Sequence, residues 1–579
     1  MVFSVSFKFL IRLSFYHEVV KNIALLAFLL LIPVEVISDT LPVKLTRQFP
    51  TESSPSIKYD AIIKASPVLD LTGSKPQLIV AVIDGTILFI DAETGEKTAQ
   101  VNIPRTAELR VLIAATPALV GSNLIVLYQM EGKGGRESHR VAVIDIAAHK
   151  LNPEFPILEL RAEKPQADDK AVVKFISSHA FSHSEVKHAK KTGSTLGYSY
   201  VAFGNAGDMQ PFHGWLFEID MDAWKNTGIK HAIKNVLVTT PENQCNVTFK
   251  YNTREMICAG GIWAPAGPQV EYNGDDYELL IPTGNGQLDL ARHDYANTLM
   301  RVKPGLEFDP ECDAMLCKDF KPSNPALACI QSCKNLFIPR LSPGDKPLKP
   351  VTGECDKLSF WECVAWMDYD LGANAPLKIE LSTQQSVIVQ ASKEGAVYLL
   401  DANHLGTVFD RMQLIETCGT KKDPCKLSWR GMMVTHPVVS VVDKTPVVIV
   451  PTFVSDNTHV AGIMGLKIVT QDGKPHFEHF WQYPNPDSPE AVIKFRSAPT
   501  LPLITSLAIH GDVIWVVEPG KTGTLYGIRI KDGKLIAKTS MLGTGISLTR
   551  PVAFGNKIYF ISRILDGKVS WVESYLIEE

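Results

Sequence analysis

Four kinds of side chain that could act on a small ligand follow one another in the central part of the chain. Trp263 lies in a Gly-Gly-Ile-Trp-Ala-Pro stretch and Asn285 in Thr-Gly-Asn-Gly, while Asp368 and Asp370 flank a tyrosine and Lys393 follows a serine. An indole can stack on a planar ring, and an amide oxygen can bind a hard metal ion. A carboxylate can accept a proton, and an ammonium can stabilise developing negative charge. The residue types therefore indicate a cofactor and metal site.

Each of these residues also has a purely structural interpretation. Trp263 could close part of a β-sheet core, Thr-Gly-Asn-Gly alone is a turn, and Lys393 could be an exposed hairpin residue. Asp368 and Asp370 could lie in a solvated turn. If they lie on a strand, however, residues i and i+2 share a face, and two like charges there raise one pKa, as a general base requires.

The elements that must position these residues read as short strands separated by turns. One strand-turn-strand unit runs from residue 78 to 95, after Ala-Ser-Pro-Val, and weaker copies follow along the chain. An Asp-Gly or Gly-Thr step between two apolar runs is typical of a hairpin. About eight units of about 65 residues fit between residue 58 and the end of the chain. We expect an all-β fold, an eight-bladed β-propeller, with a stacked solenoid as the alternative.

The motifs around Trp263, Asn285, the aspartate pair and Lys393 resemble the cofactor-binding half of the pyrroloquinoline quinone (PQQ) dehydrogenases, the quinoprotein alcohol dehydrogenase family. The resemblance implies that Trp263 stacks under PQQ and that Lys393 holds the quinone oxygens. It also implies that Asp368 removes the proton of an alcohol substrate, with Asp370 in support. The implied ligands of a Ca²⁺ ion are Asn285, Asp208 and Asp368.

The sequence also departs from the resembled family. It has no pair of adjacent cysteines, and Asp208 is the one carboxylate available where the family uses a glutamate as a metal ligand. Two functions therefore stay open. One is a PQQ- and Ca²⁺-dependent dehydrogenase that passes electrons to an external acceptor, since no Cys-x-x-Cys-His motif attaches a haem. The other is a non-catalytic propeller that binds a protein or carbohydrate through its loops.

The N-terminus predicts export. An almost wholly apolar run covers residues 23–37 and follows Lys21. We interpret residues 1–38 as a signal peptide, with an uncleaved anchor as the alternative, because a membrane span needs about 20 apolar residues. Residues 39–57 read as a linker and 58–579 as the propeller of a secreted or periplasmic protein. A net charge of −4 with scattered basic residues argues against nucleic-acid binding.

The ten cysteines lie between residues 245 and 425, and an even number behind a signal peptide predicts disulfides. Short spacing predicts three local pairs, with the four remaining cysteines paired among themselves. Zinc is the rival interpretation of those four, although their spacing matches no common zinc motif. Residues 304–362 break the repeat and read as a disulfide-laced insertion, either a structural cover or a lid. The local pairs are Cys245–Cys258, Cys355–Cys363 and Cys418–Cys425, and the remaining four are Cys312, Cys317, Cys329 and Cys333.

Overall fold

The chain forms two units, Met1–Pro42 and Val43–Glu579. The predicted signal peptide lies outside the residues that the computed structural model describes. Within the described residues, no helix is both long enough and apolar enough to cross a membrane. The described residues are 41–51, 58–59, 61–165, 172–205, 212–241, 259–286, 288–345, 355–415, 436–452, 455, 459–485, 512–518, 523–545, 549–563 and 569–578.

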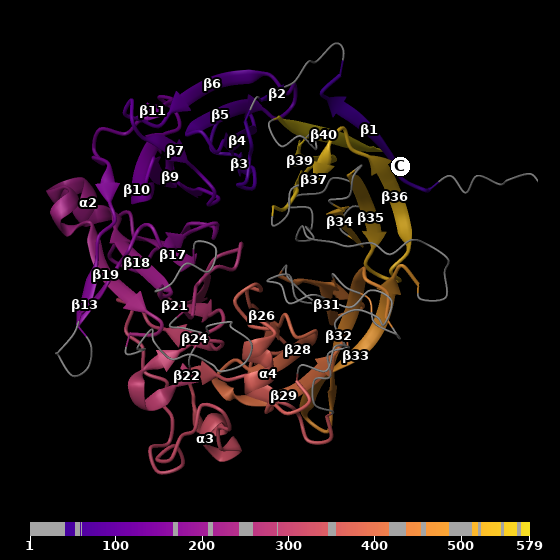
Figure 1. Ribbon diagram of the computed structural model, residues 1–579. Helices are drawn as coiled ribbons and strands as arrows, with labels where there is room; N and C mark the ends of the chain where they lie inside the picture. The colour runs from indigo at the N-terminus through magenta and orange to yellow at the C-terminus, as the bar shows by residue number, and fades with distance from the viewer. Residues whose placement is uncertain are drawn as a thin grey trace, which may run out of the picture. The chain divides into compact units, whose positions relative to one another are not determined.

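The second unit is a ring of antiparallel sheets, and eight of them are blades of a β-propeller (Figure 1). The first four blades are, in chain order, β3 (Val68–Asp70), β4 (Gln77–Ala81), β5 (Thr86–Asp91) and β6 (Lys97–Asn102); β7 (Arg110–Leu112), β8 (Ala118–Val120), β9 (Asn123–Gly132), β10 (Gly135–Asp145), β11 (Lys150–Leu151) and β12 (Leu158–Glu159); β15 (Ala180–Phe181), β16 (Lys187–Ala189), β17 (Tyr198–Asn205), β18 (Trp215–Asp220) and β19 (Ile233–Val238); and β20 (Gln269–Asn273), β21 (Asp276–Pro282), β24 (Leu299–Val302) and β25 (Leu336–Phe337).

The remaining four blades complete the ring, so the predicted eight-bladed all-β propeller is confirmed. They are β26 (Leu377–Glu380), β27 (Ser386–Ala391), β28 (Ala396–Asp401) and β29 (His404–Gln413); β30 (Val438–Val442), β31 (Thr445–Pro451), β32 (Ile463–Gln471) and β33 (Lys474–Tyr483); β34 (Val513–Glu518), β35 (Thr524–Arg529) and β36 (Leu535–Ser540); and β37 (Thr544–Gly545), β38 (Val552–Phe554), β39 (Lys557–Arg563) and β40 (Ser570–Glu578) with β1 (Lys44–Phe49) and β2 (Lys58–Tyr59).

Short elements decorate the connections between these strands. In the described residues, two small hairpins, two 3-10 turns and three short helices lie outside the blade sheets. They are β13 (Glu163–Pro165) with β14 (Val172–Lys174), β22 (Leu288–Asp289) with β23 (Asp294–Tyr295), η1 (Ile229–His231), η2 (Leu290–Arg292), α2 (Met221–Thr227), α3 (Leu327–Ser332) and α4 (Phe360–Trp366).

The last blade joins the two ends of the propeller. β1 pairs antiparallel with β40, with Thr46 opposite Leu576, so the first strand of the unit completes the final sheet (Figure 1). The prediction that residues 39–57 form a linker is therefore wrong for Lys44–Phe49. Phe49 is fully buried, and its ring lies 6.2 Å from that of Tyr559. Main-chain pairing between chain ends cannot be read from a local pattern, because the partner strand lies more than 500 residues away.

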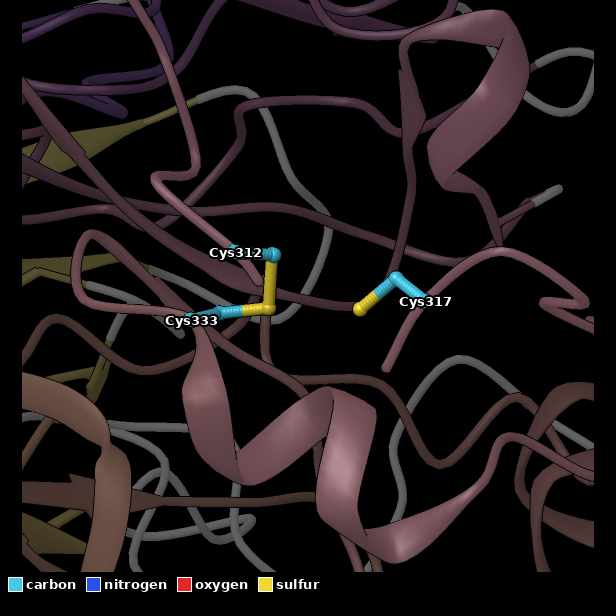
Figure 2. Close-up of side chains that lie close together, drawn as sticks. All are labelled: Cys312, Cys317 and Cys333. Atoms are coloured by element: carbon cyan, nitrogen blue, oxygen red, sulfur yellow. A yellow bond between two sulfur atoms is a disulfide. The ribbon is translucent and has the colours of Figure 1, made fainter. Parts of the chain in front are cut away.

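The cysteine-rich segment is tied into the blade rather than separate from it. The structure contains the predicted Cys355–Cys363 disulfide, and the four other cysteines pair as Cys312–Cys333 and Cys317–Cys329. Figure 2 shows the Cys312–Cys333 bond with Cys317 beside it. The three sulfurs lie within 4.8 Å of one another. Because all three are oxidised, they offer no thiolates for zinc. The segment also supplies β25, which pairs with β24, so residues 304–362 are not wholly an insertion. The other two predicted pairs lie outside the described residues.

Removing the Phe49 ring should weaken the last blade, where β1 pairs with β40. We expect Phe49→Ala to lower the free energy of unfolding by about 3–5 kcal/mol, the usual cost of emptying a buried phenylalanine site. Urea unfolding of the purified protein measures the loss. Val441→Ala, at an exposed apolar position, is the control. A loss below about 1 kcal/mol for Phe49→Ala would show that the ring does not contribute to closure.

Buried histidines should make the propeller sensitive to acid. His139 in β10 packs against the rings of Phe175 and Phe203, and burial, together with Arg136, lowers its pKa from 6.5 to about 3. The unfolded chain therefore binds a proton that the folded chain does not, so stability present above pH 6.5 is lost as the pH falls toward 3. At pH 5 this histidine should cost about 2 kcal/mol.

A substitution that cannot be protonated tests this origin of acid sensitivity. His139→Gln should lose less stability than the wild type between pH 7 and pH 5, measured by urea unfolding at both values. His231→Gln, at an exposed position, controls for the chemistry of the change. Equal losses in His139→Gln and the wild type would place the acid sensitivity in other groups.

Candidate functional site

Trp263 lies in the segment that leads into β20, where backbone from three other parts of the chain packs against it. A Cβ atom added at Gly204 would lie 3.0 Å from Trp263 Cβ, and one added at Gly284 or Gly372 would lie 2.9 or 2.6 Å from Trp263 Nε1. Only glycine fits such close approaches without a shift. The glycines in the sequence motifs thus serve to bring the chain against the indole, and they fix where its ring lies.

Lys393 connects the indole to both predicted carboxylates. Its Nζ lies 5.0 Å from the centre of the Trp263 ring, 3.1 Å from Asp368 Oδ2 and 3.0 Å from Asp370 Oδ2. The Lys393 side chain is 1% exposed, that of Asp370 2% and that of Asp368 16%. Four of the predicted site residues therefore meet within the reach of one small ligand, although they come from different segments of the chain.

The propeller repeat explains why Lys393 meets the aspartates. Lys393 lies in the turn between the second and third strands of its blade, and its backbone N–H donates to the Asp370 carbonyl at 3.1 Å. In the first blade, the N–H of Ile83 donates to the carbonyl of Ile62 at 2.9 Å in the same way. In both blades, the central hairpin turn thus lies beside the segment that enters the first strand. The repeat, more than any local motif, assembles the site.

The turn that carries the two aspartates is held by α4 and its disulfide. The N–H of Met367 donates to the Cys363 carbonyl at 2.8 Å, so the Cys355–Cys363 bond lies one turn before Asp368. Asp368 has φ 59°, in the left-handed region. Non-glycine residues are uncommon there, and such strain often accompanies function. Asp370 is fixed separately, since its Oδ1 accepts from the Gly372 N–H at 2.8 Å.

The electrostatics of the cluster favour proton exchange near neutral pH. Burial and the neighbouring Asp368 raise the pKa of Asp370 to about 7, although Lys393 acts in the opposite direction. Burial disfavours the charge on Lys393, but the two carboxylates outweigh it and raise the pKa of the ammonium. With all three groups charged, the buried cluster carries one net negative charge, so a single proton neutralises it.

A second buried network holds the strand that follows Lys393. Glu394, the next residue, pairs with Arg411 at 3.2 Å, and it accepts a hydrogen bond from the hydroxyl of Tyr398. Arg411 also pairs with Asp345 at 2.9 Å, which ties the cysteine-rich segment to this blade. The network fixes the backbone on the C-terminal side of Lys393. Like the Lys393 cluster, it places one cation between two carboxylates.

Two residues at the site were missed by sequence reasoning. The Asn297 side-chain oxygen accepts from the Leu371 N–H at 3.2 Å, while the Asn297 N–H donates to the Gly284 carbonyl at 2.8 Å. It therefore joins the aspartate turn to the Thr-Gly-Asn-Gly segment. His183 packs edge-on against Trp263 with ring centres 5.9 Å apart, and burial lowers the pKa of this histidine to about 4. Neither residue lies in a recognisable motif.

The predicted metal ligands are not brought together as clearly. The Asn285 carbonyl accepts from the Gly260 N–H at 2.8 Å, so its backbone lies beside the segment of Trp263, and its side-chain oxygen accepts from the Gly286 N–H at 3.2 Å. Asp368 pairs with Lys393, and Asp208 lies outside the described residues. In the described part of the chain, the site offers a π-face, an ammonium and two carboxylates, and the ammonium lies between the two carboxylates.

Comparisons with known proteins agree with this architecture. No protein-family model and no curated protein matches the sequence. The solved structure of a europium-containing methanol dehydrogenase is similar at 11% identity and a TM-score of 0.51, covering 90% of this chain and 92% of that one. A quinohemoprotein alcohol dehydrogenase from Pseudomonas putida HK5 is similar at 12% identity and a TM-score of 0.50, covering 90% and 75%. The chain shares the propeller fold of these quinoprotein dehydrogenases.

Filling the space beside the indole should disturb the site without changing a charge. The added methyl group of Gly372→Ala would also lie 2.7 Å from Gly284 Cα, so backbone or indole must move. We expect a loss of about 1–3 kcal/mol in the free energy of unfolding. Gly134→Ala, which meets no atom within 4 Å, is the matched control. If both variants unfold alike, the indole is not packed as the structure has it.

Proposed function

We propose that this chain oxidises an alcohol, with PQQ as the bound electron acceptor. The observation that carries the proposal is the position of Lys393 Nζ, between the face of Trp263 and the two carboxylates. A site for alcohol oxidation with a quinone needs a surface for a flat ring, a positive charge for its oxygens and a base for the hydroxyl proton. All three requirements meet at this one ammonium.

The residues present fit the cofactor in their chemistry. Trp263 offers a large flat face, and Lys393 offers a buried ammonium to anionic or carbonyl oxygens. PQQ, when bound, supplies a two-electron acceptor. Burial strengthens the interaction of Lys393 with such oxygens, because little water competes for its N–H groups. The fold similarity supports the same cofactor class, since one of the similar solved structures is a quinohemoprotein alcohol dehydrogenase.

The two carboxylates divide the remaining work. Asp368 is 16% exposed and Asp370 2% exposed, so Asp368 is the one that an alcohol hydroxyl can reach. It takes the hydroxyl proton on a carboxylate oxygen. Asp370 holds Lys393 in place and keeps the cluster close to neutral. Because a buried ion cluster stabilises a fold less than apolar packing would, its presence supports a functional role over a purely structural one.

The non-catalytic alternative would need neither the buried cluster nor the close glycine packing around Trp263. The three disulfides in the described residues support export, in keeping with a secreted or periplasmic location. An external electron acceptor completes the proposed reaction. For Ca²⁺, the second cofactor implied by the resemblance, Asn285 and Asp208 are the remaining candidate ligands.

Reconstitution with PQQ tests the proposal. We expect the purified protein to bind PQQ, seen as a shift in the quinone absorbance, and to oxidise a primary alcohol with an artificial electron acceptor. Asp368→Asn should keep the bound quinone and lose turnover by about a hundredfold or more, the usual contribution of a general base. Asparagine tolerates the left-handed conformation of this position, so the backbone should be unchanged.

Asp443→Asn is the matched control. Asp443 is exposed and also has a left-handed conformation, with φ 47°, but it lies in the hairpin between β30 and β31. It should leave both binding and turnover unchanged. Failure of the wild type to bind PQQ would reject the proposed cofactor, whereas full turnover in Asp368→Asn would show that another group takes the proton.

A further inference from the structure

The gap between Asp368 and Asp370 already holds a cation, the ammonium of Lys393. One oxygen of each carboxylate lies 3.1 and 3.0 Å from its Nζ. A Ca²⁺ ion shared by these two oxygens would lie about 2.3–2.6 Å from each. It would therefore occupy the position that the ammonium already fills. The ammonium and a metal ion therefore cannot both occupy it.

Lys393 is also held so that it cannot easily leave. Its side chain is 1% exposed, its Nζ faces the Trp263 ring at 5.0 Å, and its backbone N–H is bonded to the Asp370 carbonyl. Moving the ammonium into water would leave two carboxylates unpaired, one of them buried. Removing one partner of a buried ion cluster is costly. The lysine is thus part of the site in its resting form.

The described surroundings add no further carboxylate to the pair. Among the described residues, the one group of three or more cysteine, histidine or acidic side chains close enough to share a metal ion is Cys312, Cys317 and Cys333. Those sulfurs belong to disulfides. Ca²⁺, a hard metal ion, prefers about six to eight oxygen ligands. Two carboxylate groups that already share an ammonium between them are a poor site for one.

We propose that Lys393 is the resident cation of this site and excludes metal ions from Asp368 and Asp370. An ammonium carries three N–H donors, and the carboxylates use two of them. The third serves an acceptor oxygen of a ligand that lies against Trp263. The site therefore takes a planar ligand with anionic or carbonyl oxygens by direct contact with the lysine, without a metal bridge to the aspartates. The geometry carries this inference independently of the proposed reaction.

Terbium luminescence of the apoprotein tests whether Lys393 excludes metal ions from Asp368 and Asp370. Tb³⁺ binds where Ca²⁺ does and emits when a nearby indole is excited, and Trp263 lies beside the cluster. We expect no emission from the wild type that depends on Asp368 or Asp370, so Asp368→Asn should leave the Tb³⁺ titration unchanged. Lys393→Met, close in size but uncharged, should bind Tb³⁺ at least tenfold more tightly than the wild type. Adding Asp368→Asn to that variant should remove the gain.

Lys187→Met is the matched control, because Lys187 is a partly buried lysine paired with Glu185 at 3.0 Å; it should gain no such site. Wild-type emission that Asp368→Asn abolishes would overturn the proposal, as would a folded Lys393→Met without the gain. If Lys393→Met does not fold, the comparison of the wild type with Asp368→Asn still decides. Quinone binding is measured separately, so failure here and failure of the proposed function are distinguishable.

Discussion

The ammonium of Lys393, buried between two carboxylates and an indole, is the interaction on which the site depends. Each partner alone would be expensive to bury: two carboxylates repel each other, and a lone ammonium loses its hydration. Together they form a cluster that needs only one proton to become neutral. Such a cluster stabilises the fold little, because desolvation offsets most of the Coulomb attraction. Its cost is understandable if the charges serve a ligand.

The propeller supplies the rigidity that this cluster requires. Hairpin turns meet the segments that enter the first strands, and backbone hydrogen bonds show the same arrangement in the first blade and in the blade that carries Lys393. Glycines at 204, 284 and 372 let three segments touch Trp263. The Cys355–Cys363 bond and α4 hold the aspartate turn from one side, and the pairing of Arg411 with Glu394 holds the next strand. Because these charges are held rigidly, little free energy is spent on reorganising them when a ligand binds.

Sequence reasoning predicted the propeller from repeated local patterns, and it named the residues of the cluster from a resemblance to a known family. Hairpin signals gave the blades, and the order of Trp263, Asp368 and Lys393 carried the resemblance. It missed what depends on distant pairing. β1 meets β40 across nearly the whole chain, and Asn297 acts through backbone contacts that no motif marks. It also treated Asp368 as both base and metal ligand, since nothing local shows that Lys393 fills the gap between the carboxylates.

A crystal structure of the protein after incubation with PQQ would test the central claim most directly, that Trp263, Lys393 and the two aspartates form one ligand site. We expect the ring of the quinone against the Trp263 face, with one of its oxygens within hydrogen-bond reach of Lys393 Nζ and both aspartates still paired with the lysine. Quinone density elsewhere on the propeller, or a Lys393 side chain turned away from both ring and carboxylates, would contradict the account.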